Sequence, residues 1–190
     1  MNATLPRGRL HVHGSVFLAP GAIVCGDVTI GEGSSVWFHT VIRGDTDRIV
    51  IGAHTNVQDL TMVHVDEGCP AIVGDRVTIG HRAIVHGCVI EDDCLIGMGA
   101  IVLSGARVGA GSLVAAGALV RERQVIPPGS LVLGAPARVA GEVTDAHRAA
   151  IQRGWPHYEA LSRDYLRQGL GQPVPAPDGA ALGGAMGGAR

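Results

Sequence analysis

The sequence is poor in aromatic residues, in basic runs and in long apolar stretches, and each shortage excludes a class of protein. Only 3% of its 190 residues are aromatic, so a core built on large rings is not expected. With no basic run and a formal net charge of −2, the chain offers no electrostatic basis for binding nucleic acid. No stretch approaches the roughly 18 consecutive apolar residues of a membrane span, so no membrane partner is expected.

The N-terminal residues and the cysteines favour a cytoplasmic location. The opening MNATLPRGRLHVHG contains no apolar stretch after its arginines, which argues against a signal peptide. The four cysteines form no CxxC pair, so we expect reduced thiols of an intracellular protein: Cys25, Cys69, Cys88 and Cys94. Cys94 stands where the repeat described next requires a small inward-facing residue.

A period of six residues runs through most of the chain. Aliphatic residues recur at this spacing in four runs: Val12, Leu18, Val24, Ile30, Val36 and Ile42; Ile51, Val57 and Val63; Val73, Ile79 and Val85; and Ile90, Ile96, Val102, Val108, Val114, Val120, Ile126 and Val132. Glycine often follows the aliphatic residue. A period of six residues fits neither an α-helix, with 3.6 residues per turn, nor a simple meander of hairpins. A β-sandwich would need hairpin signals such as Asn-Gly, and the sequence contains none.

The repeat predicts an all-β solenoid, a parallel β-helix made of short strands and tight corners, in which glycine would supply unusual backbone angles. Each strand alone buries almost nothing, so stability must come from contact between neighbouring coils. We expect this β-helix domain to span residues 10–140. A C-terminal helical segment, 141–168, would pack against it, and residues 169–190, rich in Gly, Ala and Pro, would be a disordered tail.

Three histidines interrupt the small, apolar repeat. If three six-residue repeats (hexads) make one three-sided coil, the stacked coils form a prism. The hexads that begin at Ile42, Val63 and Val85 then lie on the same side of this prism. The residues that follow these three are Arg43, His64 and His86. They should therefore form one column, with neighbours about 4.8 Å apart, the spacing of adjacent strands.

His81 belongs to a different column, one side earlier. Within one chain it is not expected to reach His64 and His86, but a neighbouring copy could bring it across an edge of the prism. This arrangement predicts a cyclic homotrimer with a metal at each of three interfaces. Three neutral imidazoles with an open position are typical of a catalytic zinc site, although iron or cobalt would also suit them.

Several local motifs together resemble the γ-class carbonic anhydrase family of hexapeptide-repeat proteins. These motifs are VIRGD (41–45), NVQD (56–59), VH (63–64), GHRAIVHGC (80–88), LIGMGAIVL (95–103) and LVLGAPARVA (131–140). The resemblance covers roughly residues 10–168. It implies a left-handed β-helix with three hexads per coil, a handedness that the spacing does not reveal.

The resemblance also implies a site and a reaction. His64, His81 and His86 would be the metal ligands, with His81 donated by the adjacent subunit. Further positions match residues that line or support the family's site: Arg43, Asp45, Asn56, Gln58, Asp59 and Tyr158. Gln58 would orient the hydroxide, and Arg43 and Asp45 would also tie subunits together. The implied reaction is metal-hydroxide hydration of carbon dioxide to bicarbonate, which is a lyase activity.

Other functions remain open. An acyltransferase shares the hexad but would need acyl-CoA clefts and a single base histidine. A metal-dependent thioesterase would keep the metal and change the substrate. A catalytically lapsed scaffold is the last alternative, because Thr46 stands where the best-known family members have glutamate and VDEGCP (65–70) replaces a long acidic loop. Asp66 and Glu67 are candidate substitutes for the glutamate that carries protons in that loop.

The repeat stops after Val139, and residues 144–168 are typical of a helix. Thr144 suits the N-cap and Asp145 suits the first turn. Gly154 and Pro156 should kink or split this helix. An apolar stripe should pack on the prism through Trp155, Tyr158, Leu161 and Tyr165, and for Tyr158 core packing is an alternative to a role beside the metal.

Overall fold

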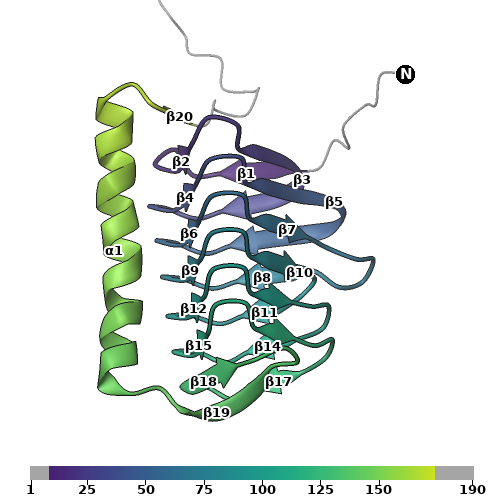
Figure 1. Ribbon diagram of the computed structural model, residues 1–190. Coiled ribbons are helices and arrows are strands. Elements are labelled where there is room, and N and C mark those ends of the chain that lie inside the picture. The colour runs from purple at the N-terminus through teal and green to yellow at the C-terminus, as the bar shows by residue number, and fades with distance from the viewer. Residues whose placement is uncertain (1–8, 174–190) are drawn as a thin grey trace, which may run out of the picture.

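Short strands wind around three sides of a prism, one coil upon the next (Figure 1). The computed structural model describes residues 9–173. The prism is a left-handed parallel β-helix of about 7 turns, as the repeat and the resemblance predicted. Each coil hydrogen-bonds to the next in parallel, so that Val85 pairs with Val63 on one side and with Val102 on the other.

The side that we call the helix face lies under the C-terminal helix. Its parallel strands are β2 (Phe17–Leu18), β4 (Ser35–Val36), β6 (Asn56–Val57), β9 (Thr78–Ile79), β12 (Leu95–Ile96), β15 (Leu113–Val114) and β18 (Ser130–Leu133). Two antiparallel strands close this sheet, β19 (Arg138–Glu142) beside β18 and β20 (Gln172–Pro173) beside β2.

The other two sides share two long strands that pass around a corner, β3 (Ile23–Ile30) and β5 (Val41–Ile51). The first side, which we call the histidine face, holds the start of both strands and β7 (Met62–His64), β10 (Ile84–His86), β13 (Ile101–Val102) and β16 (Leu119–Val120). The third face holds their ends and β1 (Leu10–Val12), β8 (Ala71–Val73), β11 (Val89–Ile90), β14 (Arg107–Val108) and β17 (Val125–Ile126).

The aliphatic residues of the six-residue period fill the interior. Ile42, Val63, Ile79 and Val85 are all 0% exposed, and Cys94 is equally buried at its small inward position. Because every coil contributes the same kind of side chain, the core is a continuous column and no coil has a core of its own. Burial raises the pKa of the Cys94 thiol to about 12, so this cysteine is a packing residue.

The glycines that follow the aliphatic residues have a different role from the one expected. Gly31 does not have a positive φ angle. A Cβ at this position would lie 2.8 Å from the amide nitrogen of Ala53 on the next coil. The close approach of two coils therefore excludes a side chain. The left-handed corner positions come two residues later. Glycine occupies several of them, such as Gly33 and Gly111, as expected, and non-glycine residues such as His54 and Arg76 occupy others.

Helix α1 (Asp145–Arg167) runs along the helix face (Figure 1) and contacts β2, β4, β6 and β9. Thr144 is the N-cap, as predicted, and its hydroxyl accepts from the amide of His147. Gly154 and Pro156 were predicted to kink or split the helix, and they do not split it, since one α-helix spans both. Gly154 instead permits close packing, because a Cβ there would lie 2.5 Å from Thr78 Oγ1.

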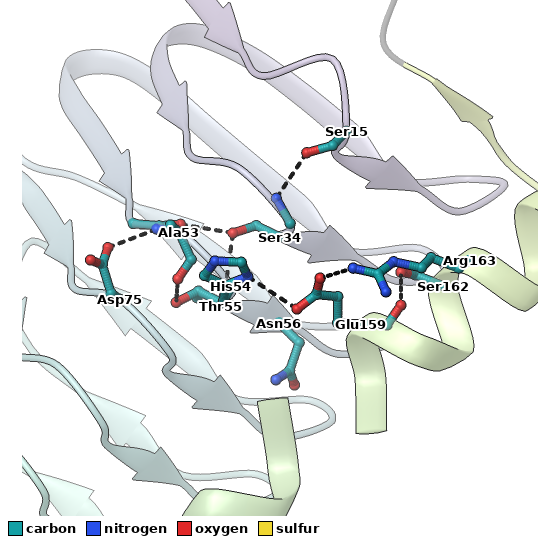
Figure 2. A network of polar contacts seen from close by, with 12 residues as sticks. Ser15, Ser34, Ala53, His54, Thr55, Asn56, Asp75, Glu159, Ser162 and Arg163 are labelled. Atoms are coloured by element: carbon teal, nitrogen blue, oxygen red, sulfur yellow. Dashed lines mark hydrogen bonds and ion pairs between the residues drawn. The ribbon is translucent and has the colours of Figure 1, made fainter. Parts of the chain in front are cut away.

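Aromatic and polar contacts fasten α1 to the prism. Tyr158 and Tyr165 pack edge-on against Trp37, at centroid distances of 5.2 and 5.5 Å, in the cluster that the apolar stripe predicted. Figure 2 shows His54 of a prism corner reaching Glu159 of the helix, with Nδ1 3.0 Å from the carboxylate. The side chains of Ser34 and Asp75 accept amide hydrogens from the neighbouring coil at the same corner (Figure 2).

Two segments depart from the regular coils. After Ile42 the six-residue period breaks, and β5 continues through residues 43–48. The tail was expected to begin at residue 169, yet residues 169–173 are described and β20 pairs with β2. The rest of the predicted tail, 174–190, lies outside the described residues. Across residues 9–173, no helix combines the length and the apolar character needed to cross a membrane.

Candidate metal centre

Arg43, His64 and His86 form the predicted column. Strand pairing sets Arg43 beside His64 and His64 beside His86, on consecutive coils at the end of the histidine face. The column also extends one coil toward the N-terminus, where Cys25 pairs with Arg43. The imidazole rings of the two histidines are 5.1 Å apart between centroids. Their neighbours in sequence, Val63 and Val85, point into the core, which turns both imidazoles outward.

Asp45 holds the outer nitrogen of His64. Its Oδ1 lies 2.9 Å from His64 Nε2, and its other oxygen pairs with Arg43. The hydrogen bond with His64, and then the Arg43 guanidinium, keep the pKa of the Asp45 carboxyl below its ordinary value. An ionised carboxylate only accepts, so Nε2 of a neutral His64 carries the proton and Nδ1 has the free lone pair.

A serine and a second aspartate stand behind His86. Ser104 Oγ lies 2.9 Å from His86 Nδ1 and 2.7 Å from Asp66 Oδ2. Asp66 itself is 3.6 Å from the same ring nitrogen. Ser104 comes from the next coil, just past the end of β13.

The remaining nitrogens of the two histidines face one another. His64 Nδ1 and His86 Nε2 are 3.1 Å apart. Two imidazole nitrogens bound to one tetrahedral zinc at about 2.0–2.1 Å would be separated by about 3.3 Å. With the Nε2 proton of His64 directed to Asp45, His64 Nδ1 is an acceptor, either for a hydrogen from His86 Nε2 or for a cation. The donor set therefore fits two ligands of a metal that prefers imidazole.

His81 lies at the opposite edge of the histidine face. It follows β9 and precedes β10, so the length of β10 separates it from His86 in the same chain. Asp59 Oδ2 lies 2.7 Å from His81 Nδ1. The proton of a neutral His81 is therefore on Nδ1, and the lone pair of Nε2 is available to a metal. Tyr158 Oη is 3.3 Å from that Nε2, and burial raises the pKa of the tyrosine.

Gln58 and Asn56 support the segment that carries His81. Gln58 Oε1 accepts from the His81 amide at 3.2 Å, and its Nε2 donates to Asn56 Oδ1 at 3.0 Å. Asn56 in turn donates to Thr78 Oγ1 at 2.9 Å. Gln58 is 5% exposed, and both the oxygen and the nitrogen of its amide help to position the corner before β10.

One chain thus holds two separate halves of a site. The first half contains Arg43, Asp45, His64 and His86 with Asp66 and Ser104, and the second contains His81 with Asn56, Gln58, Asp59 and Tyr158. Among the side chains of residues 9–173, no three His, Cys, Asp or Glu residues of one chain converge on a metal position. The metal-ligand and catalytic assignments of these residues therefore remain predictions, and so does their completion by a second copy.

Ser104 is the residue of this site that the sequence did not reveal. The column rule pairs Val85 with Val102, so the residue beside His86 on the next coil is Leu103. Ser104 lies one position further, at the corner, and reaches back to the histidine. Ser104 would have been found by counting the corner residues of each coil as well as the residues in the strand columns.

Known proteins resemble this chain in sequence. A family described as bacterial transferase hexapeptide (six repeats) matches residues 87–122. A protein of Methanocaldococcus jannaschii named "Probable carbonic anhydrase" is 55% identical over 148 residues, which cover 78% of this chain and 93% of that protein. "Gamma carbonic anhydrase 2, mitochondrial" of Arabidopsis thaliana is 43% identical over 78% of this chain, which spans only 55% of that longer protein.

A solved structure resembles the chain in fold as well as in sequence. The hexapeptide transferase family protein from Anaplasma phagocytophilum superposes with a TM-score of 0.79 at 39% sequence identity. The match covers 82% of this chain and 92% of that chain. The sequence relatives and this structural neighbour thus carry names of two different activities.

Proposed function

The chain belongs to the γ-class carbonic anhydrase family of hexapeptide-repeat proteins, and from this premise we propose that it hydrates carbon dioxide to bicarbonate at a metal centre shared between subunits. The ligands are His64 and His86 of one copy and His81 of a second copy. Zinc is the metal that we propose, and iron or cobalt would suit the same donors.

The facing nitrogens of His64 and His86 are the observation that carries this proposal. The outer nitrogen of each ring is held by an oxygen, from Asp45 in one case and Ser104 in the other, and the inner nitrogens meet at 3.1 Å. An acyltransferase site would need one base histidine rather than a matched pair. His81, with Asp59 on its Nδ1, repeats the pattern at the other edge of the face.

An apolar column on the histidine face supports assembly into a trimer. Strand register aligns six outward-facing residues along it: Ile23, Val41, Met62, Ile84, Ile101 and Leu119. Ile23 is 51% exposed and Ile84 is 36% exposed in the single chain. Continuous apolar surface of this kind marks an interface. When three such faces surround one axis, the His81 edge of each copy meets the His64 and His86 edge of the next.

The chain's own residues hold and orient the reactants in this proposal. A divalent metal bound by neutral imidazoles supplies a nucleophile at neutral pH, because it lowers the pKa of water to about 7. Asp45 and Asp59 keep the donor nitrogens of His64 and His81 free of protons. The apolar column excludes bulk water from the interface and leaves a dry space for carbon dioxide.

A second candidate is acyl transfer or thioester hydrolysis on the same scaffold. It is favoured by the likeness to the hexapeptide transferase family protein and by Thr46, which stands where the family's best-known members have glutamate. A scaffold whose activity has lapsed would share that threonine.

Metal analysis and two assays distinguish these functions. A preparation made without chelators should contain about one metal ion per chain, and stopped-flow measurement should detect carbon dioxide hydration that is lost when the metal is removed. Metal without hydration, together with acyl-CoA hydrolysis, would favour the thioesterase. A metal-free protein that transfers acyl groups would reject the carbonic anhydrase proposal.

A further inference from the structure

Each of the three site histidines has one nitrogen held by an oxygen atom, but the oxygens differ. For His64 and His81 the partner is a carboxylate, Asp45 or Asp59. For His86 it is the hydroxyl of Ser104. A carboxylate fixes the ring tautomer because it can only accept, whereas a hydroxyl can either donate or accept and fixes nothing by itself.

Asp66 decides the direction of the serine's hydrogen bond. Ser104 Oγ lies 2.7 Å from Asp66 Oδ2, and an ionised carboxylate there takes the single hydroxyl proton. Ser104 is then left with lone pairs only toward the ring, so it accepts from His86 Nδ1 at 2.9 Å. The proton of a neutral His86 therefore lies on Nδ1, and Nε2, which faces His64, keeps its lone pair.

The short loop after β7 is built to place this carboxylate. The amide of Cys69 donates to the Asp66 carbonyl at 3.0 Å, and the two residues form an isolated bridge that folds the loop into a tight turn. Cys69 Sγ donates to the carbonyl of Gly87 at 2.9 Å, which ties the turn to the residue after His86. The turn is therefore attached to the chain directly after His86.

We propose that Ser104 and Asp66 are positioning residues that hold His86 in the tautomer required for metal binding. Asp66 orients the hydroxyl, and the hydroxyl orients the imidazole. This inference rests on the proposed function, since it takes His86 to be a metal ligand. It also assigns a role to the loop 65–70 that requires no proton transfer by Asp66.

The proposal is tested by the effects of two substitutions on the tautomer and on the metal. Ser104→Ala removes the acceptor, so His86 should populate both tautomers. Asp66→Asn replaces the carboxylate by an amide that can either donate to Ser104 or accept from it, so the direction of the hydroxyl is no longer fixed and His86 should again populate both tautomers. Supporting residues of this kind typically contribute about 10- to 100-fold to metal affinity, and a loss within that range is expected for both variants.

The tautomer is measured on metal-free protein labelled with ¹⁵N-histidine, from long-range ¹H–¹⁵N correlations at alkaline pH. The His86 signals are assigned by their absence in His86→Gln. Metal affinity is measured separately by competition with a chromophoric chelator. Ser104→Thr, which keeps the hydroxyl, should restore both the Nδ1–H tautomer and the affinity.

Ser15→Ala is the matched control, because Ser15 Oγ also contacts a histidine, His13, at 2.8 Å on a distant corner. It should change neither readout. An unchanged His86 tautomer in both Ser104→Ala and Asp66→Asn would overturn the inference. A wild-type protein that binds no metal would contradict the proposed function, while the tautomer measurement on metal-free protein would still decide the hydrogen-bond argument.

Discussion

His64 Nδ1 and His86 Nε2 face each other at 3.1 Å across two neighbouring coils, while the outer nitrogen of each ring is held by an oxygen of the same chain. Strand register alone would place the two residues side by side. The partners Asp45 and Ser104 add orientation, because they turn both rings so that nitrogen faces nitrogen. In the proposed function this pair supplies two of the three metal ligands.

Removing the carboxylate behind His64 should weaken metal binding. In Asp45→Ala the proton of His64 is free to occupy either nitrogen, and Arg43 loses its partner. We expect metal affinity to fall by about 10- to 100-fold with little change in folding, as measured by chelator competition and circular dichroism. Asp47→Ala is the control on the same strand, since that carboxylate accepts from the Arg48 amide. Equal affinities for the two variants would refute the role of Asp45.

A charge in the apolar column should separate the subunits. Ile84→Glu would desolvate a carboxylate in the trimer interface, so sedimentation velocity should show monomers that retain their β-sheet spectrum and lose bound metal. Val125 is 67% exposed on the third face, and Val125→Glu should leave a trimer with its metal. A trimeric Ile84→Glu variant would show that the interface lies elsewhere.

Tyr158 should matter more for packing than for the metal. Tyr158→Phe keeps the ring against Trp37 and removes only the hydroxyl beside His81, so the loss of folding free energy should stay below about 1 kcal/mol. Metal content should not fall, because the hydroxyl and a metal compete for the same nitrogen. Tyr158→Ala should cost about 3 kcal/mol by thermal unfolding. Loss of metal in Tyr158→Phe would instead indicate a direct role at the centre.

Glu91 should contribute to stability in a pH-dependent way. It accepts the Ala110 amide at 2.9 Å and pairs with Arg107, and these contacts lower the pKa of its carboxyl. The contribution is therefore complete above the unfolded value of about 4.3 and is lost as pH falls through the lower folded value. Denaturant unfolding of wild type and Glu91→Gln should differ by at most about 1 kcal/mol at pH 7, because the pair is partly exposed. A difference that grows as pH falls below 4 would have the wrong sign.

The repeating features of this molecule could be predicted from the sequence, because each obeys a rule that every coil shares. The six-residue period locates the buried aliphatic column, and counting by coils places Arg43, His64 and His86 in register. The separation of His81 from that column followed from the same count. Thr144 was found as the N-cap of α1 because capping depends on local chemistry.

The remaining features depend on contacts that a period does not encode. Ser104 reaches His86 from a corner, so its role depends on side-chain direction. Gly31 is required by the approach of another coil and not by its own backbone angles. The pairing of β20 with β2 joins the two ends of the described chain. The continuous helix through Pro156 reflects packing on the prism, which outweighs the local preference to break.

Subunit complementation tests the shared metal centre most directly. His81→Ala keeps one half of the site and the double variant His64→Ala/His86→Ala keeps the other, so each alone should bind little metal. After equal amounts are unfolded and refolded together, about one quarter of the interfaces of random trimers should unite two intact halves, and metal content should recover to about one quarter of the wild-type level. A mixture with no more metal than the separate variants, or full occupancy in His81→Ala alone, would contradict a centre built between copies.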